Sequence, residues 1–241
     1  MFALGTIINT AAIVAGGTLG LLFGGLMALE KQEALKRVCG LGTLFIGLAG
    51  AMEWMLHVEG GRLVSGQAML VVLSLALGTA LGEIINIELG FEKFGAWLKH
   101  KSGNARDSRF IDAFVVSSLT VCIGAMAIVG AIKDGLLGDY SILAVKSVLD
   151  FIIVAVMASA MGRGAVFSAI PVFIFQGSIT VLARLIEPVM TPAATANLSL
   201  VGSILIFAVG VNLIWGKRFS VANMLPAVVF AVLAEYVPLP L

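Results

Sequence analysis

The chain has 241 residues, of which 60% are hydrophobic and only 12% charged, with a mean hydropathy of +1.08. A soluble domain carries about 25% charged residues, so this chain cannot cover an apolar core with a polar surface. The long apolar blocks, the two Cys residues and the net charge of +1 exclude a disordered chain, a disulfide-stapled domain and a nucleic-acid-binding surface. The composition therefore predicts an all-α integral membrane protein with the lipid bilayer as its surroundings and no nucleic-acid partner.

Eight apolar blocks approach the length of about 20 residues that a helix needs to cross the hydrocarbon core. The first block lacks a basic leader and a small-residue cleavage site, so we expect a retained span and not a signal peptide. Because the blocks occupy most of the chain, we predict a single transmembrane domain over residues 1–241. The predicted spans lie at about 2–26, 38–56, 66–86, 110–132, 141–161, 165–186, 195–215 and 221–237.

The basic residues are distributed unevenly between the two sides that these spans define. Eleven Lys and Arg residues follow odd-numbered spans, three follow even-numbered spans, and Lys146 lies within span five. Cytoplasmic loops are enriched in Lys and Arg, so the count predicts that both termini lie outside the cytoplasm. The eleven are Lys31, Lys36, Arg37, Lys93, Lys99, Lys101, Arg106, Arg109, Arg163, Lys217 and Arg218, and the three are Arg62, Lys133 and Arg184.

The longest loop, 87–109, has the pattern of a short amphipathic helix. Ile87, Phe91, Phe94 and Leu98 recur at helical spacing with charged residues between them. Such a helix lies on a membrane surface, which predicts a cytoplasmic amphipathic connector. The segment is either a plain connection or a docking site for a partner protein, and the pattern leaves both open.

Spans one to three weakly resemble spans six to eight. Five crossings separate the two triplets, so the triplets would be inverted relative to each other in the membrane. Inverted repeats are common in secondary transporters, whose binding sites lie between the repeats near the midplane. We therefore predict an inverted 3+3 repeat around spans four and five. At an offset of 160 residues, Gly17 matches Gly177, Gly42 matches Gly202, Ile46 matches Ile206 and Gly50 matches Gly210.

Span five contains an ionisable pair, Lys146 and Asp150, four residues apart on one helix face. Asp150 lies near the middle of the span, where a charge costs at least about 2.5–3.5 kcal/mol and indicates a functional site. Two interpretations remain. The pair is structural, each charge neutralising the other, or the carboxylate exchanges its Lys partner for a proton or a cation.

Uncharged polar residues in other spans extend this candidate site. In span six, Pro171 removes a backbone hydrogen bond and Gln176 and Gly177 follow near mid-span, which predicts an interrupted helix beside a cavity. A proline kink satisfied by neighbouring helices is the alternative. Transporters hold ions and solutes with amides and half-helix ends near the midplane. The candidate substrate-binding or ion-binding residues are Asp150, Lys146, Asn9, Ser168, Gln176, Gly177, Asn212 and Asp134.

The loop before span five holds Asp134 and Asp139 beside glycines. One interpretation is a turn in which Asp139 caps the start of span five. The other is a cation-binding mouth that includes Asp134.

Signatures of enzymes are missing from the sequence. It has no His-Glu-x-x-His, nucleophile elbow or phosphate loop, and His57 and His100 are far apart. We therefore expect a protein that is not an enzyme, with no catalytic residues, no metal and no cofactor.

Several short runs together resemble a known family. The chain is similar over essentially its whole length to the bacterial membrane-protein family of the YdfK/YqgA type, a domain of unknown function with the number 554. The resemblance implies a prokaryotic inner (plasma) membrane protein and no particular activity. The runs that carry it are Gly5–Thr10 (GTIINT), Cys122–Gly130 (CIGAMAIVG), Lys146–Asp150 (KSVLD), Phe167–Pro171 (FSAIP) and Asn223–Ala227 (NMLPA).

These observations favour a small secondary transporter or channel for a small ion or small polar solute, with a homodimer as the expected assembly. Asp150 would be the coupling carboxylate and Lys146 its exchanging counter-charge. The alternative is a non-transporting scaffold or sensor that recruits a partner through the 87–109 loop.

Overall fold

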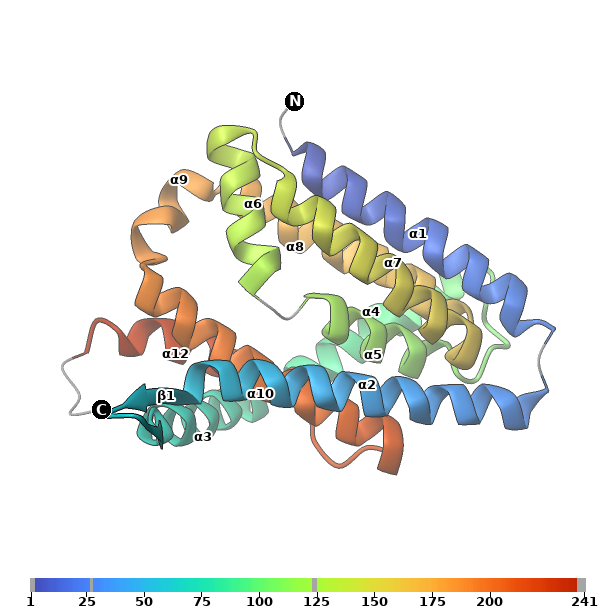
Figure 1. Ribbon diagram of the computed structural model, residues 1–241. Helices are drawn as coiled ribbons and strands as arrows, with labels where there is room; N and C mark the ends of the chain where they lie inside the picture. The colour runs from blue at the N-terminus through green and yellow to red at the C-terminus, as the bar shows by residue number, and fades with distance from the viewer. Residues whose placement is uncertain (1–2, 27, 123–124, 238–241) are drawn as a thin grey trace.

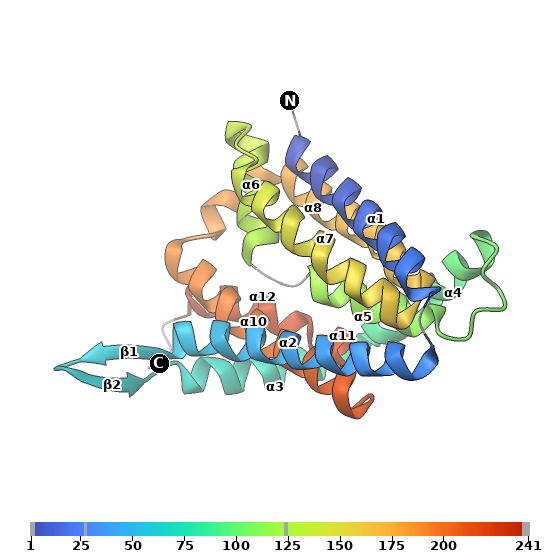
Figure 2. The ribbon, with the colours of Figure 1, turned by 45° about the vertical axis from the view of Figure 1, so that its right-hand side comes forward.

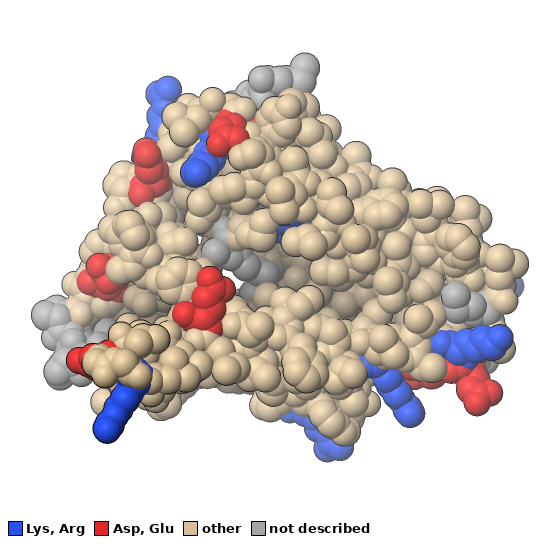
Figure 3. Space-filling view, in the orientation of Figure 1, with Lys and Arg blue, Asp and Glu red and all other residues tan. Residues whose placement is uncertain are grey.

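The structure is a computed structural model that describes residues 3–26, 28–122 and 125–237. Two layers of helices cross each other (Figure 1). The α1 layer consists of α1 (Leu4–Gly24), α7 (Ser141–Met161) and α8 (Ala169–Val181), and the α2 layer consists of α2 (Leu29–Met55), α3 (Ala68–Ile85), α10 (Pro192–Trp215) and α12 (Pro226–Ala234). Charged side chains gather mainly at the two ends of the face in Figure 3, as expected if the uncharged middle lies in lipid.

Within the described part of the chain, six stretches of helix are long and apolar enough to cross a membrane, where eight were predicted. The predicted eighth span is a short segment, Val221–Ala234, in which α11 (Val221–Met224) ends just before Pro226. At 1.5 Å per residue it covers roughly 20 Å, less than the hydrocarbon thickness of about 30 Å. The six are Leu4–Gly24, Glu30–Met55, Ala68–Ile85, Ser141–Met161, Arg163–Val181 and Pro192–Trp215.

The predicted fourth span, 110–132, is not one straight helix. It consists of α5 (Phe110–Cys122) and α6 (Ala125–Leu137), whose axes are inclined by 62°. The two helices give a seventh candidate span if they are counted as one, and we call the pair the broken span. The two helices α5 and α6 pack against different parts of the protein. Phe110 packs closely on Gly164 of η1 (Arg163–Ser168), whereas Gly135 of α6 packs against Thr180 of α8.

The interruption predicted in the sixth span, at Pro171 and Gln176, is wrong. The 3₁₀ helix η1 leads directly into α8, which runs unbroken past both residues. Pro171 lies in the first turn of α8, where backbone N–H groups have no partner within the helix, so the missing donor breaks no hydrogen bond. The broken helix is in span four instead.

Glycines bring α1 and α7 into close contact. Gly16, Gly20 and Gly24 form one stripe on α1, and a Cβ atom at Gly20 would overlap the carbonyl group of Ala155 on α7. Small residues at this spacing let helix backbones approach each other in a membrane, where burial of apolar side chains gives no net gain. The α1–α7 contact is therefore made by backbone against backbone.

Close contacts at glycines also join α2 to α10 in the α2 layer. A Cβ atom at Gly47 would overlap the backbone of Phe207, and one at Gly210 would come too close to Leu44. Glycines therefore occur on both helices of this pair, and each faces the backbone of the other helix.

A β-hairpin joins the ends of α2 and α3 and projects beyond the helices (Figure 2). Strands β1 (Leu56–Glu59) and β2 (Arg62–Ser65) pair antiparallel, with Glu59 opposite Arg62. The loop is Gly60-Gly61, and both residues have positive φ angles, 56° and 77°. These angles suit the two-residue turn that matches the twist of a hairpin.

The predicted amphipathic loop contains α4 (Ile87–Lys101), followed by an irregular stretch before α5. Its apolar side packs against the protein: Leu98 is buried with Phe110 and Phe114 of α5, and the rings of Phe94 and Phe114 lie 5.8 Å apart. Trp97 stacks on Phe94 and stays half exposed. The placement of α4 at the cytoplasmic surface stays a prediction.

The turns of the chain lie at the two ends of the bundle, and most of the Lys and Arg residues lie at one of these ends. The α1–α2 turn, α4 and the α10–α11 turn lie at one end, and the hairpin, the α6–α7 turn, α9 (Ala183–Ile186) and η2 (Glu187–Val189) lie towards the other (Figures 1 and 2). In the α6–α7 turn, the backbone N–H of Ser141 donates to Asp139, but the N-cap of α7 is Tyr140, so Asp139 lies one residue before the predicted cap position. The hydrogen bonds from Ser141 lower the pKa of this exposed carboxyl.

Candidate functional site

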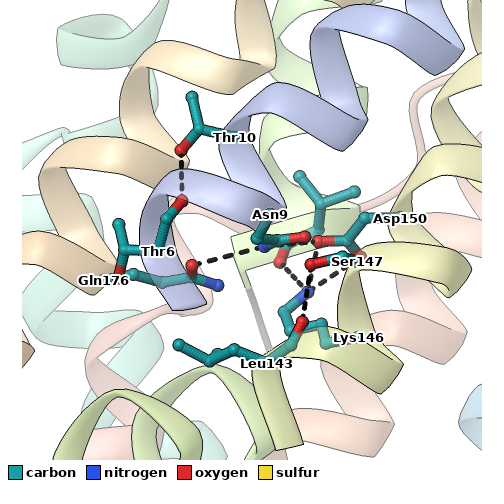
Figure 4. A network of polar contacts seen from close by, with 9 residues as sticks. Thr6, Asn9, Thr10, Leu143, Lys146, Ser147, Asp150 and Gln176 are labelled. Atoms are coloured by element: carbon teal, nitrogen blue, oxygen red, sulfur yellow. Dashed lines mark hydrogen bonds and ion pairs between the residues drawn. The ribbon is translucent and has the colours of Figure 1, made fainter. Parts of the chain in front are cut away.

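Four buried polar side chains from three helices of the α1 layer converge on one another (Figure 4). We call them the polar cluster: Asn9 from α1, Lys146 and Asp150 from α7, and Gln176 from α8. Each has a relative exposure of 7% or less. Asp150 lies near the centre of α7, so the charged pair is far from both ends of its span.

Lys146 is held by three oxygen atoms. Its Nζ lies 2.8 Å from Asp150 Oδ1, 2.6 Å from Asp150 Oδ2 and 2.8 Å from the carbonyl oxygen of Val121. An ammonium group has three N–H donors, so all of its hydrogen-bonding capacity is used. The short distances are typical of charge-assisted hydrogen bonds.

Val121 connects the ion pair to the broken span. It lies in the last turn of α5, where carbonyl groups have no donor within the helix and the helix dipole is negative. A cation beside these carbonyls is favourable, because it supplies the missing donors and opposes the dipole. Lys146 therefore neutralises Asp150 and also caps the half-helix α5.

The two amides extend the cluster from α7 to α1 and α8. Asn9 Nδ2 donates to Asp150 Oδ2 at 3.0 Å and to Gln176 Oε1 at 3.3 Å. Among the described residues, Asn9 Oδ1, Gln176 Nε2 and the neighbouring Thr6 Oγ1 have no hydrogen-bond partner, although all three are buried. A buried polar atom without a partner is costly, so this part of the cluster has unused capacity to bind a ligand.

Of the eight candidate residues, Asn9, Lys146, Asp150 and Gln176 are the ones that the structure brings together. Gly177 is not on their side of α8, because a Cβ atom built there would have open space around it. Val121 and Thr6 were missed by sequence reasoning: a backbone carbonyl has no residue signature, and a single Thr near the start of a span is not distinctive.

Ser168 and Asn212 lie outside the polar cluster and make local bonds. Ser168 Oγ donates to the carbonyl oxygen of Ala165 within η1. Asn212 shapes the turn after α10, where its side chain accepts from the backbone of Arg218 and exchanges hydrogen bonds with Phe219. Both were predicted as ligands because they are polar residues within or near spans.

Asp134 is buried in α6, where the sequence suggested a turn or an open mouth. Its Oδ2 accepts from the backbone N–H of Gly5 at 2.9 Å, and its Oδ1 has no partner among the described residues. Gly5 lies in the first turn of α1, where the helix dipole favours a carboxylate. Asp134 thus fixes the start of the helix that carries Asn9.

A cavity of about 220 Å³, which we call the vestibule, lies at the end of the bundle where most of the basic residues are found. Lys217 Nζ binds Glu88 Oε1 at 2.7 Å, and the hydrogen bond to Glu88 raises the pKa of Lys217. The vestibule extends to Leu119 of α5, two residues before Val121. Its charged lining residues are Lys36, Glu88, Glu92, Asp112 and Lys217, and apolar ones include Val115, Val116, Leu119, Met161 and Val209.

A second hollow is visible on the face shown in Figure 3, between α6 on one side and the α2 layer on the other. The Lys146–Asp150 pair itself is buried in the protein interior.

These features define a multi-pass helical membrane protein with an ion pair buried beside a broken span. The chain belongs to the family described as "Protein of unknown function (DUF554)", which matches residues 4–236 and confirms the predicted membership.

Two relatives match over most of their length. The chain is 32% identical over 223 residues to the "Uncharacterized membrane protein YdfK" of Bacillus subtilis (strain 168), which covers 92% of this chain and 91% of the relative. It is 32% identical over 232 residues to the "Uncharacterized protein YqgA" of Escherichia coli (strain K12), with coverage of 95% and 94%. No solved structure matches the chain.

Proposed function

We propose that this protein is a small secondary transporter or channel of the bacterial inner membrane for a small ion or small polar solute. The observation that carries the proposal is the Lys146–Asp150 pair, buried at the middle of α7 and in contact with the end of the half-helix α5. Ionisable groups at membrane depth are costly and mark ion or substrate pathways. Half-helix ends beside such groups are a recurring element of transporter binding sites.

In the proposed mechanism Asp150 is the coupling carboxylate. With Lys146 bound, the pair is neutral and the cluster is stable in a low-dielectric environment. A proton or another cation at Asp150 would release Lys146 from the carboxylate. Because Lys146 also caps α5 through Val121, its release would remove a bond that holds the broken span in its present position.

The vestibule supports access from one side of the membrane. Its lining combines charged residues such as Glu88 and Lys217 with apolar residues that include Leu119 and Met161. In the proposed mechanism, apolar side chains such as Leu119 form the barrier between the vestibule and the polar cluster. A transporter needs a closed barrier of this kind, since a continuous aqueous path would dissipate the gradient.

An inverted repeat would explain how the helices pair. The repeat predicted from the sequence relates α1 to α8, α2 to α10 and α3 to α12, and the members of each pair pack against each other. Gly47 of α2 faces Phe207 of α10, and these positions differ by the repeat offset of 160 residues. A residue that meets its own counterpart would lie on the symmetry axis between the repeats.

The scaffold alternative has less support. It needs a free apolar face on α4, and the residues that would form this face, Phe94 and Leu98, pack against Phe114 and Phe110 of α5. The buried ion pair would also have no role in recruiting a partner.

Reconstitution tests the proposal directly. Purified protein in liposomes would be exposed to gradients of inorganic cations, anions and small polar solutes, with uptake of each measured directly and internal pH followed by a pH-sensitive dye. We expect saturable flux above protein-free liposomes for at least one of them, and its loss in Asp150→Asn. Asp139→Asn is the matched control, because Asp139 is an exposed carboxylate in the α6–α7 turn.

Two outcomes would contradict the transporter. Folded Asp150→Asn with undiminished flux would remove Asp150 from the mechanism. A complete absence of flux, with Asp150→Asn only less stable, would make the pair structural.

A further inference from the structure

We propose that the polar cluster is a binding site for a monovalent cation, and that the ammonium group of Lys146 occupies it as a tethered ion. A free cation of similar size would take the place of Lys146 between Asp150 and Val121. This inference rests on the proposed transport function, of which it names the ligand class.

The groups around the Lys146 ammonium are those of a cation site. Both carboxylate oxygens of Asp150 and the carbonyl oxygen of Val121 lie within 2.8 Å of Nζ. Carboxylate and carbonyl oxygens are the ligands that inorganic cations take in proteins. The three oxygens come from two helices, so the site exists only where α5 and α7 meet.

Asn9 offers a further oxygen that Lys146 does not use. Its Nδ2 is engaged by Asp150 and Gln176, while its Oδ1 is fully buried and has no partner among the described residues. Figure 4 places this amide beside the Asp150 carboxylate. A free ion, which has no side chain to tether it, would be able to move towards Asn9 and gain this fourth ligand.

Charge balance indicates both the sign and the valence of the ligand. In the cluster Asp150 is the anionic side chain and Lys146 the cationic one, so one free positive charge keeps the site neutral when the Lys146 ammonium has swung out of the cluster or is removed by substitution. A divalent cation would leave an uncompensated charge in a low-dielectric interior. An anion would face the Asp150 carboxylate and the negative end of the α5 dipole.

The test uses the full chain in detergent with Lys146→Met, which keeps an unbranched side chain and removes the charge. Thermal unfolding would be measured in ammonium, potassium, sodium and choline chloride at equal ionic strength. We expect the Tm of Lys146→Met to rise saturably in ammonium or potassium chloride. At one hundred times the dissociation constant the rise should be roughly 5–10 °C relative to choline.

The matched control is Lys146→Met/Asp150→Asn, which lacks the anionic ligand as well. It should fold and have the same Tm in all four salts. If Lys146→Met has the same Tm in ammonium, potassium and sodium as in choline, the proposal is overturned. The same holds if Lys146→Met fails to fold in every salt while the double variant folds.

If neither variant folds, the wild-type protein decides. In the wild-type protein a free cation has to displace Lys146 from the carboxylate. We therefore expect the Tm to rise saturably as before, at a cation concentration at least tenfold higher than an exposed site would need. Asp150→Asn should lose this rise. A wild-type Tm that does not depend on the cation would overturn the proposal.

Flux separates this inference from the proposed function. Transport by the wild type together with a cation-indifferent Lys146→Met would keep the transporter and remove the tethered-ion site. Cation-dependent stability without any flux would keep the site and remove the transporter.

Discussion

The two helix layers are assembled in the same way, and only one of them encloses charge. In both layers glycines bring helix backbones together, through Gly20 on α1 and through Gly47 on α2. Among the described residues, the α2–α10 contact contains no ion pair, whereas the α1–α7 contact ends in the Lys146–Asp150 pair.

The difference shows that close glycine contacts between helices can support a buried polar site in one layer and a purely packed contact in the other. Along α1 the glycine stripe lies towards the basic end of the bundle, and Asn9 lies one to two turns nearer the other end. The stripe fixes α1 on α7, and the remaining part of the same interface is free to hold polar groups. In the α2 layer, glycine contacts with α10 continue along α2 from Gly40 to Gly50, which favours a supporting role.

The largest expected effect comes from adding one methyl group to either glycine contact. Gly20→Ala and Gly47→Ala should each destabilise the protein by about 4 kcal/mol or more, because the new Cβ overlaps backbone that cannot rotate away. Unfolding in detergent measures the loss. Gly42→Ala and Gly177→Ala are matched controls with open space around the Cβ, and should change stability by no more than about 1 kcal/mol.

The comparison of the layers fails if only one of the two substitutions is harmful. A tolerated Gly47→Ala would mean that α2 and α10 can separate slightly, and that the α1 layer alone depends on backbone contact.

A smaller effect, of about 3–5 kcal/mol, is expected from removing one partner of the buried pair. Lys146→Met alone leaves a buried carboxylate, and Asp150→Leu alone leaves a buried ammonium, which is why each should be costly. The double variant Lys146→Met/Asp150→Leu should recover most of the loss, because no charge remains to be compensated. A double-mutant cycle on Tm or on unfolding free energy measures this coupling.

If the two single losses simply add in the double variant, the charges do not depend on each other. The α1 layer would then resemble the α2 layer in being held by packing alone.

The smallest effect is expected at the mouth of the vestibule, where a pair of the same chemistry is partly exposed. Lys217→Met should cost about 0–1 kcal/mol, since Lys217 is 61% exposed and its contact with Glu88 is screened by water. Glu88 raises the pKa of Lys217, so the contribution is present at neutral pH and lost as pH rises above the usual lysine value of about 10.4. The wild-type and variant Tm should converge there. A persistent difference would show that Lys217 acts through packing.

Much of the fold follows from the positions of apolar blocks in the sequence. The bilayer requires long apolar helices, so six spans were predicted close to where the structure has them. The convergence of Asn9, Gln176 and Asp150 was also predictable. Polar side chains in the middle of spans avoid lipid by facing one another, even when the sequence does not say which helices meet.

Other features depend on contacts that leave no sequence signal. The break between α5 and α6 has no proline to mark it, and it arises because Phe110 and Gly135 pack on different partners. Asp134 looked like a turn residue because glycine follows it, but its role is set by the distant backbone of Gly5. The hairpin was missed although Gly60-Gly61 between short alternating strands is a recognisable signal.

That hairpin has a mechanical consequence. The ladder from Leu56 to Ser65 is extended by a bond of 2.8 Å from the Gly66 N–H to the carbonyl oxygen of Met55, so pairing begins at the last residue of α2. A hydrogen-bonded hairpin with a two-residue loop is a short and stiff connection, and it holds the end of α2 at a fixed distance from the start of α3. Any rocking of α2 would be transmitted to α3, and from α3 to α12. The α2 layer would then move as one rigid body relative to the α1 layer, which contains the buried ion pair.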